Sequence, residues 1–209
     1  MTTIVSDKYK ILYIHIPKTG GISVNKWFQE LDPDAGSISE RKHDSLISLK
    51  QKHGTKFDSY FKLAVVRNPW SRAVSLYEYR KKMLRGNIRN WPLHWPSRND
   101  VEKMTFKEVV QNSLIERQEG RRVSWLESHC SSWITLDEKI AVDFVCKQEN
   151  LENDLRKVTE KLGLTMPDLP RLNTTQKAEY TTYYDDFSRN VIAKKCALDI
   201  KNFGYEFGH

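Results

Sequence analysis

Two short apolar runs, each followed by a turn and then by helix-like spacing, stand out in the pattern of hydrophobic and polar positions. The first run covers residues 11–16 and the second covers residues 63–66. Both runs are short, apolar and bounded by turn residues, which is typical of buried strands. Because apolar positions recur at helical spacing after each run, the sequence predicts two strand-turn-helix units of an α/β fold.

The turn after the first run favours the binding of an anion. Pro17 ends the strand, and two glycines let the backbone turn tightly before the helical spacing begins. A strand, a glycine loop and a helix N-terminus together direct several N–H groups and the positive end of a helix dipole at one point. The residues expected to surround a phosphate or sulfate there are Lys18, Thr19, Gly20, Gly21 and Ser23.

The position of the lysine separates this turn from the phosphate loop of NTPases. That loop reads G-x-x-x-x-G-K-[ST], with the lysine after the glycines, whereas Lys18 precedes Gly20 and Gly21. One interpretation is therefore a tight turn with a solvated lysine. The strand before the turn, the helix after it, and one lysine and two hydroxyl residues within six positions favour an anion site instead.

A second polar group is expected beside the first turn. Arg67 directly follows the second apolar run, Pro69 lies at the start of the next helix, and Ser75 lies one turn beyond Ser71 on that helix. Ligands of open α/β sheets gather at the carboxyl ends of the strands, so Arg67 and Ser75 are candidates for binding a second anionic group. The alternative is that Arg67 pairs with a carboxylate and Ser75 is only a helix residue.

Composition and charge restrict the class of protein without choosing a ligand. The chain has 209 residues, of which 39% are hydrophobic and 11% aromatic, and this is sufficient for a single domain over residues 1–209. Its net charge of +7 favours acidic partners such as nucleotides, acidic glycans, nucleic acids or anionic membranes. The three cysteines have no metal-type spacing and are expected to be buried thiols. We expect no metal site.

The apolar segments suggest a cytoplasmic protein. The first residues of the sequence contain no apolar leader, and no later apolar run approaches the ~20 residues that a membrane span requires. We therefore expect a cytoplasmic location and no membrane span.

His43 stands just ahead of a short helix that we predict over residues 44–52. Most histidines in basic segments are surface or capping residues, and on the residues alone this is the simpler interpretation. An imidazole with its ordinary pKa of ~6.5 can also accept a proton at neutral pH, as a general base does.

Together, the two turns resemble motifs of the sulfotransferase family. Ile16-Pro-Lys-Thr-Gly-Gly with Ser23 is similar to the loop that holds a 5′-phosphosulfate, and Val66-Arg-Asn-Pro-Trp-Ser-Arg-Ala-Val-Ser75 is similar to the 3′-phosphate motif. The likeness is greatest to the branch of heparan sulfate 2-O-sulfotransferases, chondroitin-type carbohydrate sulfotransferases and their bacterial relatives. It continues through the strand and Glu-Asn-Leu helix of residues 142–155 to the C-terminal segment, and covers nearly the whole chain.

The resemblance implies a P-loop-kinase-like three-layer fold with a central, mostly parallel sheet flanked by helices. It also implies an enzyme that moves a sulfuryl group in line from 3′-phosphoadenosine 5′-phosphosulfate (PAPS) to a hydroxyl of a glycan or glycoside. The product of the donor is 3′-phosphoadenosine 5′-phosphate (PAP). The implied donor contacts are Lys18, Thr19, Gly20, Gly21 and Ser23 to the 5′-phosphosulfate, Arg67 and Ser75 to the 3′-phosphate, and Thr175 from a covering loop, with Lys18 and the base His43 as catalytic residues.

Residues 85–135 are interpreted as an insertion and helices on the acceptor side. Aromatic and arginine residues alternate in the loop 85–98, which we expect to bind the acceptor, while Trp125 and Trp133 are expected in the core. The chain departs from the family pattern at Ile22, where a hydroxyl residue is frequent.

Two other functions remain open at this stage. The first is a nucleotide-dependent kinase of the same fold, and the second is a non-catalytic module that binds an anion. A nucleic-acid partner is not expected.

Overall fold

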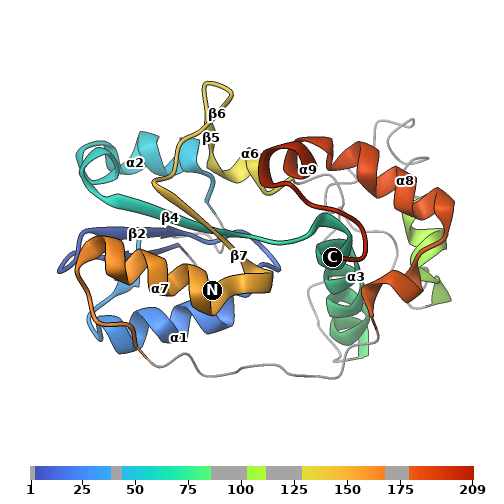
Figure 1. Cartoon of the computed structure of the whole chain (residues 1–209), viewed down its shortest axis with the longest axis horizontal. Helices are drawn as coiled ribbons and strands as arrows, with labels where there is room; N and C mark the ends of the chain where they lie inside the picture. Colours follow the sequence, from blue (N-terminus) through green and yellow to red (C-terminus); the bar gives the residue numbers. More distant parts are fainter. Residues whose placement is uncertain (1–2, 39–43, 86–102, 112–128, 168–178) are drawn as a thin grey trace. The chain divides into compact units, whose positions relative to one another are not determined.

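The chain folds into two compact units, each built from two stretches of sequence (Figure 1). Unit 1 combines Met1–Arg67 with Cys130–Thr175, and unit 2 combines Asn68–His129 with Gln176–His209. The two predicted strands and the glycine turn lie in unit 1. The computed structural model describes residues 3–38, 44–85, 103–111, 129–167 and 179–209.

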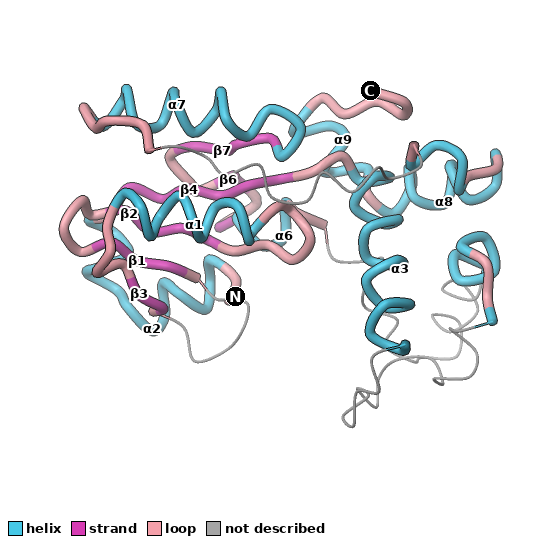
Figure 2. The backbone as a smooth tube through the Cα atoms, turned by 90° about the horizontal axis from the view of Figure 1, so that it is seen from below, coloured by secondary structure: helices cyan, strands magenta, loops and turns pink. Residues whose placement is uncertain are grey.

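Unit 1 is organised around a five-stranded sheet with the strand order β3-β1-β2-β4-β7, which Figure 2 shows side by side. β2, β4 and β7 are parallel neighbours, whereas β1 is antiparallel to β2 and to β3. Only β1 is therefore reversed among these strands. The strands are β1 (Ile4–Ser6), β2 (Ile11–Ile14), β3 (Gly36–Ser37), β4 (Phe61–Val66) and β7 (Phe144–Lys147).

Residues 11–14 of the first apolar run form β2, and all four side chains are buried. It lies between β1 and β4, and its alternate residues point to opposite faces of the sheet. Ile11 and Tyr13 belong to one hydrophobic core, so Leu12 and Ile14 point to the other face. The parallel pairing of Ile14 with Ala64 brings the carboxyl ends of β2 and β4 to the same edge of the sheet.

Helices cover both faces of this sheet, with α1 and α7 on one side and α2 and α6 on the other (Figure 1). The side chains of Trp27, Phe28 and Leu155 pack on the face of Tyr13 and have no exposed surface. Burial of such a side chain contributes about 1.5–3 kcal/mol relative to an exposed position. The elements are α1 (Gly21–Leu31), α2 (Leu46–Ser59), α6 (Ser131–Ile134), the hairpin of β5 (Thr135–Leu136) and β6 (Lys139–Ile140), the 3-10 turn η1 (Gln148–Asn150) and α7 (Leu151–Leu162).

A buried carboxylate fixes the turn between β7 and α7. Asp154 accepts hydrogen bonds from the backbone N–H of Lys147 (2.9 Å) and from Nδ2 of Asn150 (3.1 Å). At the other end of the helix, Gly163 adopts a left-handed conformation with φ of 66°, and its N–H bonds to the carbonyl of Glu160. The helix predicted in this segment is thereby confirmed, and in the structure it ends at Gly163.

Asn68 organises the start of unit 2. Its Oδ1 accepts from the N–H groups of Trp70 (3.1 Å) and Ser71 (3.3 Å), so it caps α3. Its Nδ2 donates to the carbonyls of Glu206 (2.8 Å) and His209 (3.0 Å), which ties the C-terminal segment to the same point. The described helices of unit 2 are α3 (Pro69–Arg85), residues 106–111, the 3-10 turn η2 (Tyr180–Tyr183), α8 (Asp186–Lys195) and α9 (Ala197–Phe203).

The prediction of an α/β fold with a central, mostly parallel sheet flanked by helices is confirmed. The closer likeness to P-loop kinases, the single domain over residues 1–209, the acceptor-side insertion at 85–135 and the cytoplasmic location stay predictions. All three cysteines are buried thiols, as expected. Among the described helices, none has the length and apolar character to cross a membrane.

Two local predictions differ from the structure. The helix predicted over residues 44–52 is longer, because α2 continues to Ser59 across a break at Gly54 (φ 9°, ψ −88°). Trp133 is half-buried rather than part of the core, and Trp125 lies outside the described residues.

Candidate active site

The candidate site begins with a strained loop at the carboxyl end of β2. Lys18 has φ of 68° and Gly20 has φ of 90°, so both adopt the left-handed conformation. That conformation is easy for a glycine but costs a residue such as lysine of the order of 1 kcal/mol. Strain of this kind clusters at functional sites, and alternating backbone conformations form concave groups of N–H donors that bind anions.

Thr19 holds the loop from inside. Its side chain has no exposed surface, and its hydroxyl donates a hydrogen bond to the carbonyl of Ile16 (2.9 Å). The hydroxyl is thus engaged within the loop, where it fixes the turn that follows β2.

Close packing leaves no room for a side chain at Gly21 and little room at Gly20. An ideal Cβ on Gly21 would lie 2.1 Å from Nε2 of His15, which is buried at the end of the first apolar run. A Cβ on Gly20 would lie 3.2 Å from Cγ of Gln148, which follows β7. His15 and Gln148 therefore form the inner wall of the loop. We call Lys18–Gly21 with these two side chains the glycine-loop cradle.

The N-terminus of α1 opens into this cradle. Within the described residues 20–24, the N-cap Gly20 has no side-chain cap and the first turn contains no acidic residue. The N–H groups of Ser23 and Val24 bond to the carbonyl of Gly20 (3.0 and 3.3 Å), so α1 begins directly at the loop. A helix start without its own capping carboxylate leaves the positive end of its dipole to a bound anion.

Arg67 joins the cradle from the neighbouring strand. It follows β4, which is the parallel neighbour of β2, and its Nη1 donates to the backbone carbonyl of Lys18 at 3.4 Å. The structure thus brings together Lys18 and Arg67, which are 49 positions apart in the sequence. Two cationic residues therefore lie at the carboxyl ends of adjacent parallel strands, where ligands of α/β proteins bind.

The remaining predicted residues have different outcomes. Ser23 is partly exposed in the first turn of α1, next to Ile22, whose side chain is 45% exposed. Ser75 is buried in α3 and belongs to unit 2, so it is described with that unit and not with the cradle. His43, Thr175 and most of the 85–98 loop lie outside the described residues. Their predicted roles stay predictions.

His15, Gln148 and Asn68 are residues that the sequence patterns did not single out. His15 stands inside an apolar run, which marks it as a core position rather than a site residue. Gln148 follows β7, and the sequence does not show that β7 lies close to the glycine loop; the strand order does. Asn68 caps α3 next to Arg67, and an asparagine before a proline at a helix start was the available signal.

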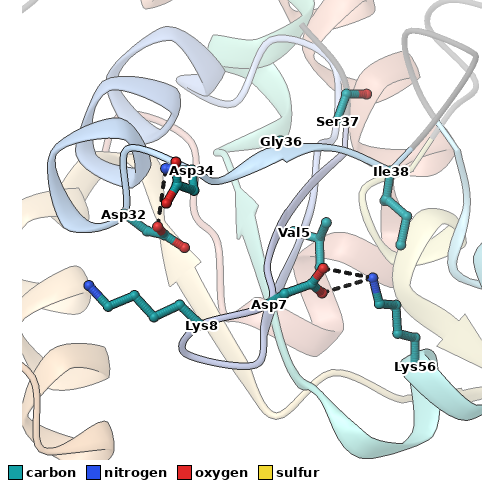
Figure 3. Close-up of a pocket in the computed structure, with 9 residues that line it drawn as sticks. All are labelled: Val5, Asp7, Lys8, Asp32, Asp34, Gly36, Ser37, Ile38 and Lys56. Atoms are coloured by element: carbon teal, nitrogen blue, oxygen red, sulfur yellow. Dashed lines mark hydrogen bonds and ion pairs between the residues drawn. The ribbon is translucent and has the colours of Figure 1, made fainter.

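A cavity of about 530 Å3 in unit 1 is unsuited to an anionic ligand (Figure 3). Asp7, Asp32 and Asp34 line it, beside the turn that leads into β2 and the C-terminal end of α1, and so at the edge of the sheet opposite the cradle. A hydrogen bond from Lys56 and another from Tyr60 hold the pKa of Asp7 below its ordinary value. Asp7 therefore stays charged at neutral pH and is paired with Lys56 (2.8 Å). The lining has three aspartates against two lysines, Lys8 and Lys56, so its charge does not favour an anion.

Comparison with known proteins gives a consistent group of relatives. A model described as the sulfotransferase family matches residues 1–206. Carbohydrate sulfotransferase 10 of Mus musculus is 24% identical over 246 residues, which cover 97% of this chain and 66% of the relative. Carbohydrate sulfotransferase 14 of Mus musculus is 25% identical over 182 residues, which cover 75% of this chain and 45% of the relative.

The match to an uncharacterised protein of Archaeoglobus fulgidus covers most of that shorter relative. The two are 29% identical over 133 residues, which correspond to 63% of this chain and 92% of the relative. By contrast, the chain spans just under two thirds of carbohydrate sulfotransferase 10 and less than half of carbohydrate sulfotransferase 14. No solved structure is significantly similar to this chain.

Proposed function

We propose, since the chain belongs to the sulfotransferase family, that it transfers a sulfuryl group from PAPS to a hydroxyl of a carbohydrate. The observation that carries the proposal is the hydrogen bond from Arg67 to the carbonyl of Lys18. It places a second cation next to a glycine-loop cradle, and PAPS carries a second phosphate at its 3′ position. The names of the curated relatives support a carbohydrate as the acceptor.

The cradle fits the phosphosulfate end of the donor. Lys18, Gly20 and Ser23 are the partly exposed residues around its opening, whereas Thr19 and Gly21 are buried and hold the loop in shape. We assign the 5′-phosphosulfate to Lys18, to the hydroxyl of Ser23 and to the backbone N–H groups of Thr19, Gly20 and Gly21. Arg67 is assigned to the 3′-phosphate, and the family resemblance adds Ser75 and Thr175.

The residues of this chain would contribute to the transfer mainly through charge and position. Sulfuryl transfer builds negative charge on the leaving phosphate, and donors already fixed around that position stabilise it without further reorganisation. The ammonium of Lys18 and the α1 N-terminus supply such donors. The acceptor oxygen must lie in line with the bond that breaks. We assign His43 to removing the proton of the acceptor hydroxyl.

Calorimetric titration with PAP and, in parallel, with ATP-Mg²⁺ tests this function. We expect PAP to bind and ATP-Mg²⁺ to bind far more weakly, because Lys18 precedes the glycines, unlike the lysine of an NTPase loop. Lys18→Ala should weaken PAP binding by about tenfold or more, the usual cost of a lost hydrogen bond to a charged group.

Lys26→Ala is the matched control, since Lys26 is an exposed lysine of α1, the helix that follows the loop of Lys18. It should leave the affinity for PAP unchanged. Preference for ATP-Mg²⁺ would instead indicate a kinase, and binding of neither nucleotide would overturn the proposal. PAP binding without release of PAP from PAPS in the presence of mixed glycans would point to a non-catalytic anion-binding module.

A further inference from the structure

A second cavity, of about 430 Å3, lies wholly within unit 2. It is formed by α3, the segment 103–107 and η2. Three lysines line it, Lys81 from α3 and Lys103 and Lys107 from the segment, so we call it the lysine groove.

The floor of the lysine groove is aromatic and rigidly held. Tyr77 and Phe106 are buried, and their rings meet edge to face with centroids 5.5 Å apart. The hydroxyl of Tyr77 donates to the backbone carbonyl of Met104 (2.9 Å), which fixes the lining segment against α3. Tyr183 of η2 packs against Phe106 at 6.0 Å and is only half-buried, so part of its ring remains available to a ligand.

A capping box fixes the chain between Lys103 and Lys107. The backbone N–H and the hydroxyl of Thr105 both donate to the carboxylate of Glu108 (2.6 and 2.8 Å), and the N–H of Glu108 returns a bond to the Thr105 hydroxyl (3.3 Å). These bonds define the start of the helix at residues 106–111. The two lysines therefore leave a defined turn rather than an unconstrained loop.

The charged residues that line the lysine groove are all lysines. The Nζ of Lys81 lies 4.9 Å from the ring centroid of Tyr77, which places its ammonium over the floor. Lys107 forms an ion pair with Asp185 at 3.5 Å, but its side chain stays 52% exposed. Glu78 accepts a hydrogen bond from Tyr183 (3.2 Å) at the edge of the floor. Three lysines thus line a concave surface, and three carboxylates, those of Glu78, Glu108 and Asp185, lie beside it in contact with lining residues.

We propose that the lysine groove binds an acidic sugar residue, with its carboxylate or sulfate held by the lysines. The proposal rests on the proposed function and specifies the acceptor as an acidic carbohydrate. The cavity volume lies in the ~300–1,000 Å3 range of small-molecule sites. Lysine ammonium groups act as flexible point charges for an anion, and a tyrosine ring offers an apolar face and a hydroxyl to a sugar. A duplex nucleic acid binds through a row of phosphate contacts along its backbone, and these need a longer basic surface than this cavity offers.

Binding of a hyaluronan tetrasaccharide, which carries carboxylates and no sulfate, tests the proposal. The variant Lys81→Gln/Lys103→Gln/Lys107→Gln should bind it about tenfold or more weakly, since each exposed ion pair contributes up to ~1 kcal/mol. The control variant Lys82→Gln/Lys194→Gln/Lys201→Gln removes the same charge from exposed lysines of α3, α8 and α9. It should stay within about twofold of the wild type, and neutral chitotetraose should bind weakly to all three proteins.

The outcomes separate this proposal from the proposed function. PAP affinity is measured on the same three proteins and should be equal in all of them. Failure of the wild type to bind PAP overturns the proposed function, and with it the acceptor role of the groove, but not the binding of an acidic sugar there. Equal weakening by the groove variant and the control variant would overturn the lysine groove as a site. So would absence of tetrasaccharide binding to the wild type, or groove-dependent binding to phosphatidylglycerol vesicles that exceeds binding to the saccharide. Matching thermal unfolding of the variants confirms that each one is folded.

Discussion

The imidazole of His15 occupies the space that a side chain at Gly21 would need. An ideal Cβ on Gly21 would lie 2.1 Å from Nε2 of His15, far inside van der Waals contact. The His15 side chain is 5% exposed and packs 5.8 Å from the ring centroid of Tyr13, so it has little room to move away. The start of α1 can therefore lie where it does only because residue 21 is a glycine.

Gly21→Ala should shift the loop and weaken both folding and PAP binding. Overpacking of a well-filled site costs typically ~1–3 kcal/mol, and we expect part of this cost to appear as reduced affinity for PAP. Chemical denaturation and calorimetric titration measure the two effects separately.

The double variant His15→Ala/Gly21→Ala provides the control for this clash. Removal of the imidazole creates space for the new methyl group, so the double variant should bind PAP more tightly than Gly21→Ala alone. The single variant His15→Ala is measured as well. If its loss of PAP affinity and that of Gly21→Ala simply add in the double variant, the 2.1 Å clash is not the reason why residue 21 must be a glycine.

Arg67→Ala should weaken the binding of PAP by about 10- to 100-fold, the range for a hydrogen bond to a charged group. Adenosine 5′-phosphate lacks the 3′-phosphate, so its affinity should fall much less. Some loss is still expected, because Arg67 also holds the carbonyl of Lys18. Arg156→Ala, at an exposed arginine of α7, is the control. Equal weakening for both nucleotides would assign Arg67 to loop support rather than to the 3′-phosphate.

Ile22→Thr should strengthen PAP binding by about 2- to 10-fold. The side chain of Ile22 is 45% exposed at the second residue of α1, where a hydroxyl could donate to the anion in the cradle. A hydrogen bond of this kind adds a net ~0.5–1.5 kcal/mol. Ile47 is a close match, since it is 49% exposed at the second residue of α2. Ile47→Thr should not change the affinity, and an unchanged affinity for Ile22→Thr would place residue 22 away from the anion.

The local pattern of apolar residues was sufficient to predict the central strands of unit 1. β2 and β4 are apolar because they have neighbours on both sides and helices on both faces, and this leaves a clear signal in the sequence. β3 leaves none, since Gly36 and Ser37 are exposed and extended only through pairing with β1. The predicted helix over residues 44–52 was too short. A glycine usually ends a helix, but Gly54 only interrupts α2.

The candidate site was predictable where a single segment of sequence contains both the polar groups that would bind an anion and the glycines that form the turn. Lys18, Gly20 and Gly21 meet that condition, whereas Gln148 reaches Gly20 only because β7 is the second neighbour of β2. The role of the Thr19 hydroxyl likewise depends on its burial, which a short polar motif does not reveal. Contacts between distant segments follow from strand order and register, and those are set by the packing of the whole unit.

Asp185 gives α8 a contribution to stability that depends on pH. Hydrogen bonds from the hydroxyl and the backbone N–H of Ser188 lower the pKa of Asp185 from 3.8 to about 2. Since the pKa in the folded protein is below that of the unfolded chain, the stabilisation is complete above pH ~4 and is lost as the pH falls towards ~2. Asp185→Ala should therefore be less stable than the wild type at pH ~6, with a smaller difference at pH ~3.

Thermal unfolding of the two proteins across this pH range measures the effect. Asp58→Ala, which removes an exposed carboxylate close to the C-terminal end of α2, is the comparison. A difference between the wild type and Asp185→Ala that stays constant with pH would show that the carboxylate does not cap α8 in its charged form.

His43→Ala should lower the turnover of PAPS by about 100-fold, a typical contribution of a general base. PAP affinity should stay nearly unchanged, because a base acts on the acceptor and not on the donor. The wild type should lose activity below pH ~6.5 as the imidazole becomes protonated, and the variant should lose this dependence. His53→Ala, at a histidine of α2, is the control and should keep both the turnover and the pH profile. If PAP affinity falls together with turnover in His43→Ala, the histidine binds the donor and another group accepts the proton.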